Sequence, residues 1–409
     1  MTTHGTANLV LGTVESVLPA RRRGLGLISR AELIAVHPLG PGFLVEVSSD
    51  VGRLVVPMMA GADGVLRRAV AGDGMSAAVL RSASLEQLGP LPAETGEHGI
   101  AVDQTNESVV VGGAVVVKWM LVAESEPTAS TRAARRLAAA GFAPTPAPIG
   151  LLHLDDRLVA TVHAHVPDAV DGWDWLVADL VAWVAGDGPD PIGAATHLGA
   201  LAADLHLVLS TPVAADEAWT SAWHAHARQQ LAEAIAVTDG DAGTRLRDWS
   251  PAIERALDQV LTIAGIAVAP IHGDLHVGQF LRSVRGMWIV DFDGDPLSAS
   301  TSRLELAPPA VDVASLLRSI DHAGRIADRR TDRRHTATIE DWLARARMGA
   351  LEAYTGRCDL LDERLLGALE VAQECHEYVY AARYLPHWVY VPDAALPVLM
   401  KDSVDGRRD

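Results

Sequence analysis

The residues best suited to chemistry are concentrated in residues 271–296, which read IHGDLHVGQFLRSVRGMWIVDFDGDP. Asp274 is followed five residues later by Gln279, and a short apolar strand predicted at 287–290 leads to Asp291 and Asp293. Transfer of a phosphoryl group from ATP uses one carboxylate to orient the attacking hydroxyl, and an amide with a second carboxylate to hold Mg²⁺ against the phosphates. The segment therefore favours a phosphotransferase.

The order and spacing of these residues match the catalytic motifs of protein kinases. Kinases place an H-R-D loop, with Asn five residues after the Asp, just before a strand that ends in D-F-G. In this chain Gly273 replaces the Arg, Gln279 the Asn and Asp293 the last Gly. Gly and Asp also gather in turns for conformational reasons. A loop, a strand and a second acid in this order over about twenty residues favour function over a plain turn.

A second functional interpretation uses the alternation of His272, Asp274 and His276. A strand would turn all three side chains to one side, as a metal site requires. Two glycines interrupt the segment, and no further His ligands follow nearby in the sequence. A hydrolytic metal site is therefore the weaker hypothesis.

The charge and cysteine content limit the partners of the chain. Its 409 residues carry 34 basic and 52 acidic side chains, a formal net charge of −18. This excess disfavours nucleic acid and anionic membrane as partners, and it is compatible with a cationic substrate. Two cysteines are too few for a disulfide framework. Without a signal peptide or an apolar run long enough to span a membrane, we expect a cytoplasmic protein.

The order of predicted elements indicates an α+β fold. Strand patterns occupy the first part, with short strands at 43–47 and 53–57 and a valine-rich hairpin at 108–118. A helix is expected at 128–140 and a strand pair at 149–165. Beyond Pro167 the apolar spacing is helical, and the last predicted helix covers 365–385. A β-rich lobe joined to a helical lobe follows from this order.

Lys118 ends the valine run at 115–117 and matches the strand lysine that binds ATP phosphates in kinases. Taken alone, a strand-end lysine reaching solvent is the better interpretation. The acids and the amide follow later in the chain in the order found in kinases, and this order favours phosphate binding by the lysine. Residues 104–108, ending at Ser108, stand where kinases have a Gly-rich loop; they either donate to phosphate oxygens or form a solvated turn.

A kinase also pairs its strand lysine with an acid on a helix. The helix expected at 128–140 contains no acid, although Glu124 and Glu126 lie just before it. Either one of these two glutamates reaches Lys118, or the pairing is absent.

Two further segments are candidates for binding substrates. Residues 163–167 join the two lobes, and backbone groups beside His163, His165 and Val166 are placed to bind adenine, unless the segment is a covalent hinge only. In the last predicted helix, Gln373, Glu377 and Tyr380 share one face, which suits a sugar or amino sugar. An exposed helix face is the alternative for these three residues. His206, a lone histidine on an apolar helix, is expected to be structural.

Together these segments resemble the actinobacterial maltokinase and glucosamine kinase group of the aminoglycoside phosphotransferase-like kinases. The resemblance rests on HGDLH at 272–276 and DFDGDP at 291–296, and it extends over roughly residues 104–392. It implies a bilobal protein-kinase-like fold with a β-rich cap at 1–92, the rest of the ATP-binding N-lobe at 93–166 and a helical C-lobe at 167–409.

The resemblance also implies ATP, Mg²⁺ and a sugar as small-molecule partners, with defined residue roles. Asp274 is then the catalytic base, Gln279, Asp291 and Asp293 hold the metal, and Lys118 binds phosphate. The acceptor pocket is then lined by four residues: Arg282, Gln373, Glu377 and Tyr380.

The last helix departs from the maltokinase pattern E-K-x-x-Y-E, since residues 372–377 read AQECHE. Neutral Gln373 beside Glu377 favours a protonated amine, so glucosamine, phosphorylated at its 6-hydroxyl, is the expected acceptor. Maltose, giving maltose 1-phosphate, and an aminoglycoside are the alternatives. A hypothesis from another functional class is a catalytically silent nucleotide-binding regulatory protein. The missing helix acid motivates this alternative.

Overall fold

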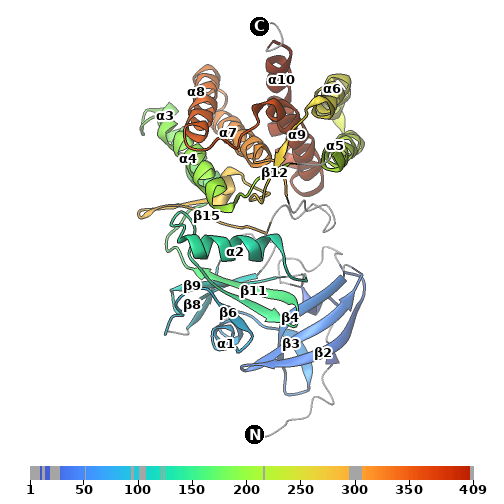
Figure 1. The fold of residues 1–409 in the computed structure, drawn as a ribbon, viewed down its shortest axis with the longest axis vertical. Coiled ribbons are helices and arrows are strands. Elements are labelled where there is room, and N and C mark those ends of the chain that lie inside the picture. Colours follow the sequence, from blue (N-terminus) through green and yellow to red (C-terminus); the bar gives the residue numbers. More distant parts are fainter. Residues whose placement is uncertain are drawn as a thin grey trace. The chain divides into compact units, whose positions relative to one another are not determined.

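The computed structural model divides the chain into two units, residues 1–168 and 169–409. Strands dominate the first unit and helices the second (Figure 1), so the predicted α+β class is confirmed. The finer division of the first unit at residue 92 stays a prediction. The structure describes residues 10–11, 14–18, 28–50, 52–93, 96–100, 107–120, 122, 125–214, 217–293 and 306–405.

The first unit opens with a five-stranded sheet in the order β1-β5-β4-β3-β2. Its strands are β1 (Val10–Leu11), β2 (Ala31–Leu39), β3 (Gly42–Ser49), β4 (Gly52–Ala60) and β5 (Val65–Arg68). Side chains alternate between two buried layers, as the period of a strand requires. Val45 and Leu54 belong to one apolar cluster, and Leu44 and Val55 to another.

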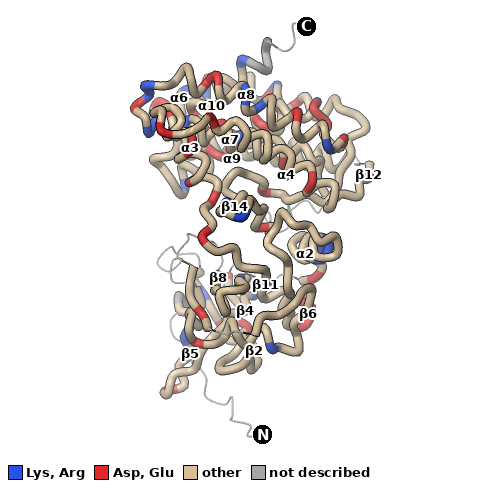
Figure 2. The backbone as a smooth tube through the Cα atoms, turned by 90° about the vertical axis from the view of Figure 1, so that its left-hand side faces the viewer, with Lys and Arg blue, Asp and Glu red and all other residues tan. Residues whose placement is uncertain are grey.

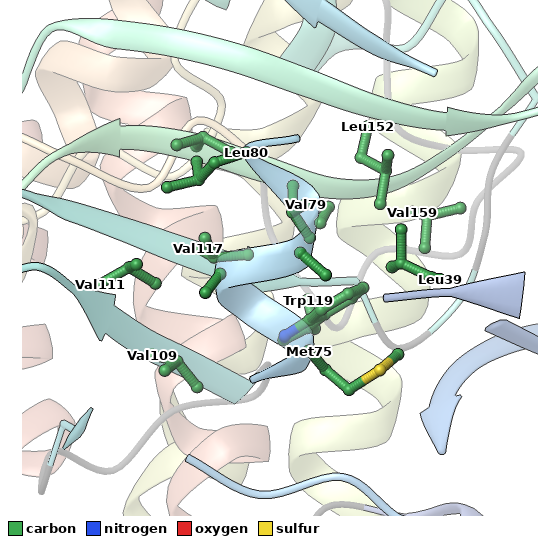
Figure 3. Packing of buried hydrophobic residues seen from close by; sticks show 14 of the residues in the cluster. Leu39, Met75, Val79, Leu80, Val109, Val111, Val117, Trp119, Leu152 and Val159 are labelled. Atoms are coloured by element: carbon green, nitrogen blue, oxygen red, sulfur yellow. The ribbon is translucent and has the colours of Figure 1, made fainter. Parts of the chain in front are cut away.

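A six-stranded sheet in the order β6-β10-β11-β9-β8-β7 completes the first unit. Helix α1 (Met75–Val79) packs on it, with Met75 and Val79 among the apolar side chains around Trp119 (Figure 3). The Trp119 indole N–H also donates to the Ser76 hydroxyl over 3.0 Å. Helix α2 (Ala129–Ala140) begins with a capping box of Thr128 and Thr131. The strands are β6 (Leu85–Gln87), β7 (Glu97–Gly99), β8 (Glu107–Val111), β9 (Val115–Trp119), β10 (Pro148–Leu154) and β11 (Arg157–Ala164).

The second unit is built on helices, which are listed at the end of this paragraph. Helix α4 has the length and hydropathy of a membrane span, but more than half of it is buried inside the unit. A Cβ on Gly199 would lie 2.1 Å from the Ala350 carbonyl oxygen, so α4 packs against the backbone of α8 and is a core helix. The helices are α3 (Gly172–Ala185), α4 (Ile192–Leu209), α5 (Glu217–Val237), α6 (Gly240–Asp258), α7 (Ala310–Arg330), α8 (Thr336–Thr355), α9 (Leu366–Tyr384) and α10 (Tyr390–Asp405).

Short elements connect these helices. Strands β12 (Val213–Ala214) and β13 (Ala267–Val268) pair with each other, and β14 (Phe280–Ser283) pairs with β15 (Gly286–Ile289). The latter hairpin lies within the segment singled out in the sequence. The 3₁₀ turns are η1 (Val14–Val17), η3 (Gln259–Thr262), η4 (Val277–Gln279), η5 (Glu363–Leu365) and η6 (Pro386–Trp388).

Helix α10 was not predicted, because Pro392 and Pro397 interrupt its sequence. Pro392 lies in the first turn, where a missing N–H costs nothing. Leu396 and Met400 are buried against the neighbouring helices, and this packing outweighs the second proline. Acidic positions are spread along both units, so the excess negative charge is not confined to one segment (Figure 2).

Candidate active site

The loop that carries Asp274 is held by one buried carboxylate. Asp312, in the first turn of α7, accepts hydrogen bonds from the backbone N–H groups of His272 (2.7 Å) and Gly273 (2.9 Å). Its Oδ2 also lies 2.9 Å from Nε2 of His206 on α4. Three segments of the chain therefore meet at one side chain that is 0% exposed. Asp274 follows directly from the two anchored residues.

The hydrogen bonds to Asp312 keep its carboxylate charged. Burial by itself would raise the pKa of this group. The hydrogen bond and charge of His206, with the contributions of His272 and the Gly273 N–H, hold the pKa of Asp312 below its ordinary value. His206 in turn contacts the Tyr354 hydroxyl through Nδ1 at 2.7 Å. His206 therefore lies in the core, as expected, and it orients Asp312.

Asp274, His276 and Gln279 converge at the end of this loop. Gln279 Nε2 lies 3.4 Å from Asp274 Oδ2, and His276 Nε2 lies 3.7 Å from the same oxygen. The His276 ring stacks on Trp173 with a centroid separation of 5.9 Å. Because a quarter of the Asp274 side chain stays exposed, a small substrate can reach its carboxylate.

The β14–β15 hairpin brings the second acid to the same loop. The backbone N–H of Val290 donates to the Gln279 carbonyl oxygen (2.9 Å), and His272 Nε2 lies 2.9 Å from the Val290 carbonyl oxygen. The Phe292 ring packs on His272 at 4.8 Å between centroids. Asp291, between Val290 and Phe292, has a φ of +66° and emerges beside the loop. Asp293 follows two residues later.

The second half of α9 acts electrostatically on the same loop. Burial lowers the pKa of His276, and the negative charge of Glu377 acts in the opposite direction. Gln373 lies one turn before Glu377 on the same helix face, and its Nε2 donates to Glu377 Oε1 over 3.3 Å. Tyr380 extends this face, where its ring contacts Tyr384 with a centroid separation of 5.3 Å. The structure thus brings Gln373 and Glu377 together and places Glu377 within electrostatic reach of His276.

Buried ion pairs between α7 and α9 fix the position of α9. Glu374 Oε1 lies 3.0 Å from His322 Nε2, and Glu370 accepts from Arg318 (3.2 Å) and from Arg347. Glu370, Glu374 and Glu377 recur at helical spacing, so one side of α9 is a row of carboxylates. The first two are bound by cationic side chains in the interior.

Arg282 lies on β14 and is engaged with α3. Its guanidinium pairs with both carboxylate oxygens of Asp179, at 2.5 and 2.9 Å, and its Cζ lies 4.4 Å from the centroid of the Trp175 ring. Its predicted contact with the acceptor stays a prediction.

The candidate phosphate-binding residues of the first unit are cross-strand neighbours. Ser108 on β8 pairs in register with Lys118 on β9, and Lys118 pairs with Thr161 on β11. Val117 and Trp119 face the core, so Lys118 points to the opposite face of the sheet. Residues 104–106, the rest of the polar loop predicted to contact phosphates, lie outside the described residues.

The other predicted residues of the first unit lie at the end of β11. His163 pairs in register with Val116, the His165 N–H donates to the Ala114 carbonyl oxygen (2.8 Å), and Val166 follows. Adenine binding by this segment stays a prediction. Glu126, one candidate partner of Lys118, binds His153 (2.8 Å), Thr131 (2.8 Å) and Arg135 (3.2 Å). The other candidate, Glu124, lies outside the described residues.

Sequence reasoning missed Asp312, and it overlooked one signal for Lys118. An acid in the first turn of a helix is ordinarily explained by the helix dipole, so nothing in the sequence separates Asp312 from other first-turn acids. Lys118 and Lys401 are the only lysines of a chain whose other basic residues are arginines. In so arginine-rich a composition, a lysine at position 118 favours a specific role for that residue.

The fold and the loop define a phosphotransferase. A family model described as the phosphotransferase enzyme family (APH) matches residues 100–351, more than half of the chain, and the chain belongs to this family. A glucosamine kinase of Streptacidiphilus jiangxiensis is 39% identical, with 95% of this chain and 96% of that protein covered. A glucosamine kinase of Mycolicibacterium smegmatis is 36% identical, with coverages of 89% and 97%.

Solved structures of glucosamine kinase are similar over nearly the whole chain. One crystal form has a TM-score of 0.85 at 36% identity and covers 95% of this chain and 98% of that one. A complex with glucosamine, ADP and inorganic phosphate has a TM-score of 0.80 at 36% identity, with coverages of 94% and 96%. The resemblance drawn from the sequence and the expected kinase-like fold are confirmed.

Proposed function

We propose that this enzyme transfers the γ-phosphoryl group of MgATP to the 6-hydroxyl of glucosamine. The observation that carries the proposal is the loop held by Asp312, on which Asp274 and Gln279 converge and which the β14–β15 hairpin joins to Asp291. The close similarity to glucosamine kinases supports the choice of acceptor. A cytoplasmic location is part of the proposal.

In this mechanism Asp274 accepts the proton of the acceptor hydroxyl. The hydroxyl oxygen attacks the γ-phosphorus, the bond to the β–γ bridging oxygen breaks, and ADP leaves. The loop geometry orients Asp274 because the two preceding residues are hydrogen-bonded to Asp312. A positioned base of this kind contributes roughly 10²–10⁴-fold in rate.

The donor atoms on the loop fit Mg²⁺. This ion prefers oxygen ligands and commonly uses one or two carboxylates together with water and substrate phosphates. The amide oxygen of Gln279 and the carboxylates of Asp291 and Asp293 are ligands of this kind. The backbone hydrogen bond from Val290, the residue before Asp291, to Gln279 joins the two segments that carry them. Bound Mg²⁺ would neutralise charge on the phosphates. Lys118, with Ser108 opposite it, is proposed to bind phosphate oxygens from the first unit.

The acceptor amine is proposed to bind Glu377. Glu370 and Glu374 in the same row are bound by arginine and histidine side chains, whereas Glu377 accepts from the neutral amide of Gln373. A half-buried carboxylate held this way is suited to a protonated amine. Maltose has no amine, and this difference disfavours it as the acceptor.

Release of ADP with glucosamine, glucose, maltose and kanamycin tests the proposed reaction. We expect the highest kcat/KM for glucosamine, with glucose weaker because it lacks the amine. A preference for maltose or kanamycin would overturn the acceptor and leave the phosphotransfer mechanism intact. ATP binding without turnover of any of the four compounds would favour a silent nucleotide-binding regulator.

Changing Glu377 to Gln should raise the KM for glucosamine about 10-fold or more, since a charge-assisted hydrogen bond contributes about 1.5–3 kcal/mol. The kcat/KM for glucose should stay near that of the wild type, because glucose has no amine. Steady-state kinetics with both sugars measure the difference. Glu352→Gln on the exposed surface of α8 is the matched control. Equal losses for glucose and glucosamine would exclude amine recognition by Glu377.

A further inference from the structure

We propose that the first turns of α3 act as a positioning clamp for the loop that carries Gln279. The clamp consists of Val170, Gly172, Trp175 and Asp179, and it is called the α3 clamp below. The inference rests on the proposed role of Gln279 as a Mg²⁺ ligand. It assigns the clamp an effect on metal-dependent nucleotide binding, and it gives Arg282 a role away from the sugar.

The backbone of the α3 clamp is in direct contact with the loop. Val170 and Arg282 exchange two backbone hydrogen bonds, of 2.9 and 2.8 Å, just before α3 begins. A Cβ on Gly172 would lie 1.6 Å from the Val277 carbonyl oxygen and 3.2 Å from the Gly278 nitrogen. No larger residue fits at position 172 unless the 3₁₀ turn η4, which ends at Gln279, moves away.

The side chains of the α3 clamp hold the residues that follow Gln279. The Trp175 indole N–H donates to the Phe280 carbonyl oxygen over 2.9 Å, and the Trp175 side chain is 2% exposed. Two residues later, the Arg282 guanidinium forms a two-point ion pair with Asp179 and lies over the Trp175 ring. A planar fork in two hydrogen bonds fixes orientation as well as distance.

Gln279 is therefore fixed on both sides by one helix. The residue before it is confined by Gly172, and the residue after it is hydrogen-bonded to Trp175. Metal ligands must stay within a fraction of an ångström of the binding geometry, and the residues that contact them fix this position. Loss of such supporting contacts typically weakens metal binding by about 10–100-fold.

The test compares Trp175→Phe with Trp183→Phe, the same change about two turns further along α3. Calorimetric titration of ADP, with Mg²⁺ and with EDTA, gives the gain in ADP affinity that Mg²⁺ provides. We expect Trp175→Phe to lose about 10-fold of this gain and to keep the wild-type affinity in EDTA. Trp183→Phe should match the wild type in both titrations. The KM for glucosamine should be unchanged in both variants.

The other outcomes separate failure of the α3 clamp from failure of the proposed Mg²⁺ site. If Mg²⁺ raises the ADP affinity of Trp175→Phe as much as that of the wild type, the α3 clamp does not position Gln279. If Mg²⁺ does not raise the ADP affinity of the wild type, the proposed Mg²⁺ site itself is refuted. If Trp175→Phe does not fold, Asp179→Asn serves in the same titrations, because Asp179 is only half-buried. If Asp179→Asn keeps the whole gain in ADP affinity from Mg²⁺ but has a raised KM for glucosamine, Arg282 belongs to the acceptor pocket.

Discussion

Replacement of Asp274 by Asn should lower kcat for glucosamine phosphorylation by about 10²–10⁴-fold. Asn has the shape of Asp but cannot accept the hydroxyl proton. The loop should keep its geometry, because Asp312 binds the backbone of His272 and Gly273 and not the Asp274 side chain. ADP release at saturating substrates measures the loss, and thermal unfolding checks that the variant is folded.

Asp248→Asn, an exposed change on α6, is the control for this prediction and should keep full activity. An Asp274→Asn enzyme with near-wild-type kcat would mean that another group accepts the proton, or that the reaction does not need a base. Either result would remove Asp274 from the proposed mechanism.

The second large effect is expected on stability. Asp312→Ala leaves the N–H groups of His272 and Gly273 and the ring of His206 without their shared acceptor. Each buried donor left without an acceptor costs about 1–3 kcal/mol, so a loss of several kcal/mol is expected. Urea unfolding should show this loss in the free energy of unfolding, and activity should fall because the loop is no longer held. Asp312→Asn keeps the volume and one acceptor oxygen, so a smaller loss is expected.

The effect of Asp312 should also depend on pH. Its pKa in the folded protein is held below the ordinary value, near 4, that it has in the unfolded chain. Its charge therefore stabilises the fold above the unfolded pKa, and the contribution is lost as the pH falls through the folded pKa. The stability difference between the wild type and Asp312→Asn should shrink as the solution is acidified below about pH 4. A difference that is constant down to the acid limit would contradict a charged Asp312.

Much of the fold was predictable, because local patterns determine it. The valine-rich hairpin at 108–118 appears as β8 and β9, and the helix expected at 128–140 appears as α2 with its capping box. The strand at 287–290 appears as β15, one residue earlier. In each case alternation, capping residues or turn residues specify the element without distant partners.

The contacts that organise the site were not predictable, since they join residues far apart in the sequence. Asp312 lies 40 residues from His272 and 106 from His206. The guanidinium of Arg282 is engaged with Asp179, 103 residues away. Spacing along the chain carries no signal for such pairs, so the anchoring of the loop emerged only with the structure.

The hydrogen bonds to Asp312 have a consequence for hydrogen exchange in the loop that carries Asp274. Loop amides ordinarily exchange their hydrogens with solvent quickly, but those of His272 and Gly273 are bonded to a carboxylate buried at the start of α7. They can exchange only when α7 separates from the loop, so their protection should equal that of the α7 core. An opening that separates α7 from the loop would also release Asp274, so exchange at these two amides reports on the integrity of the loop.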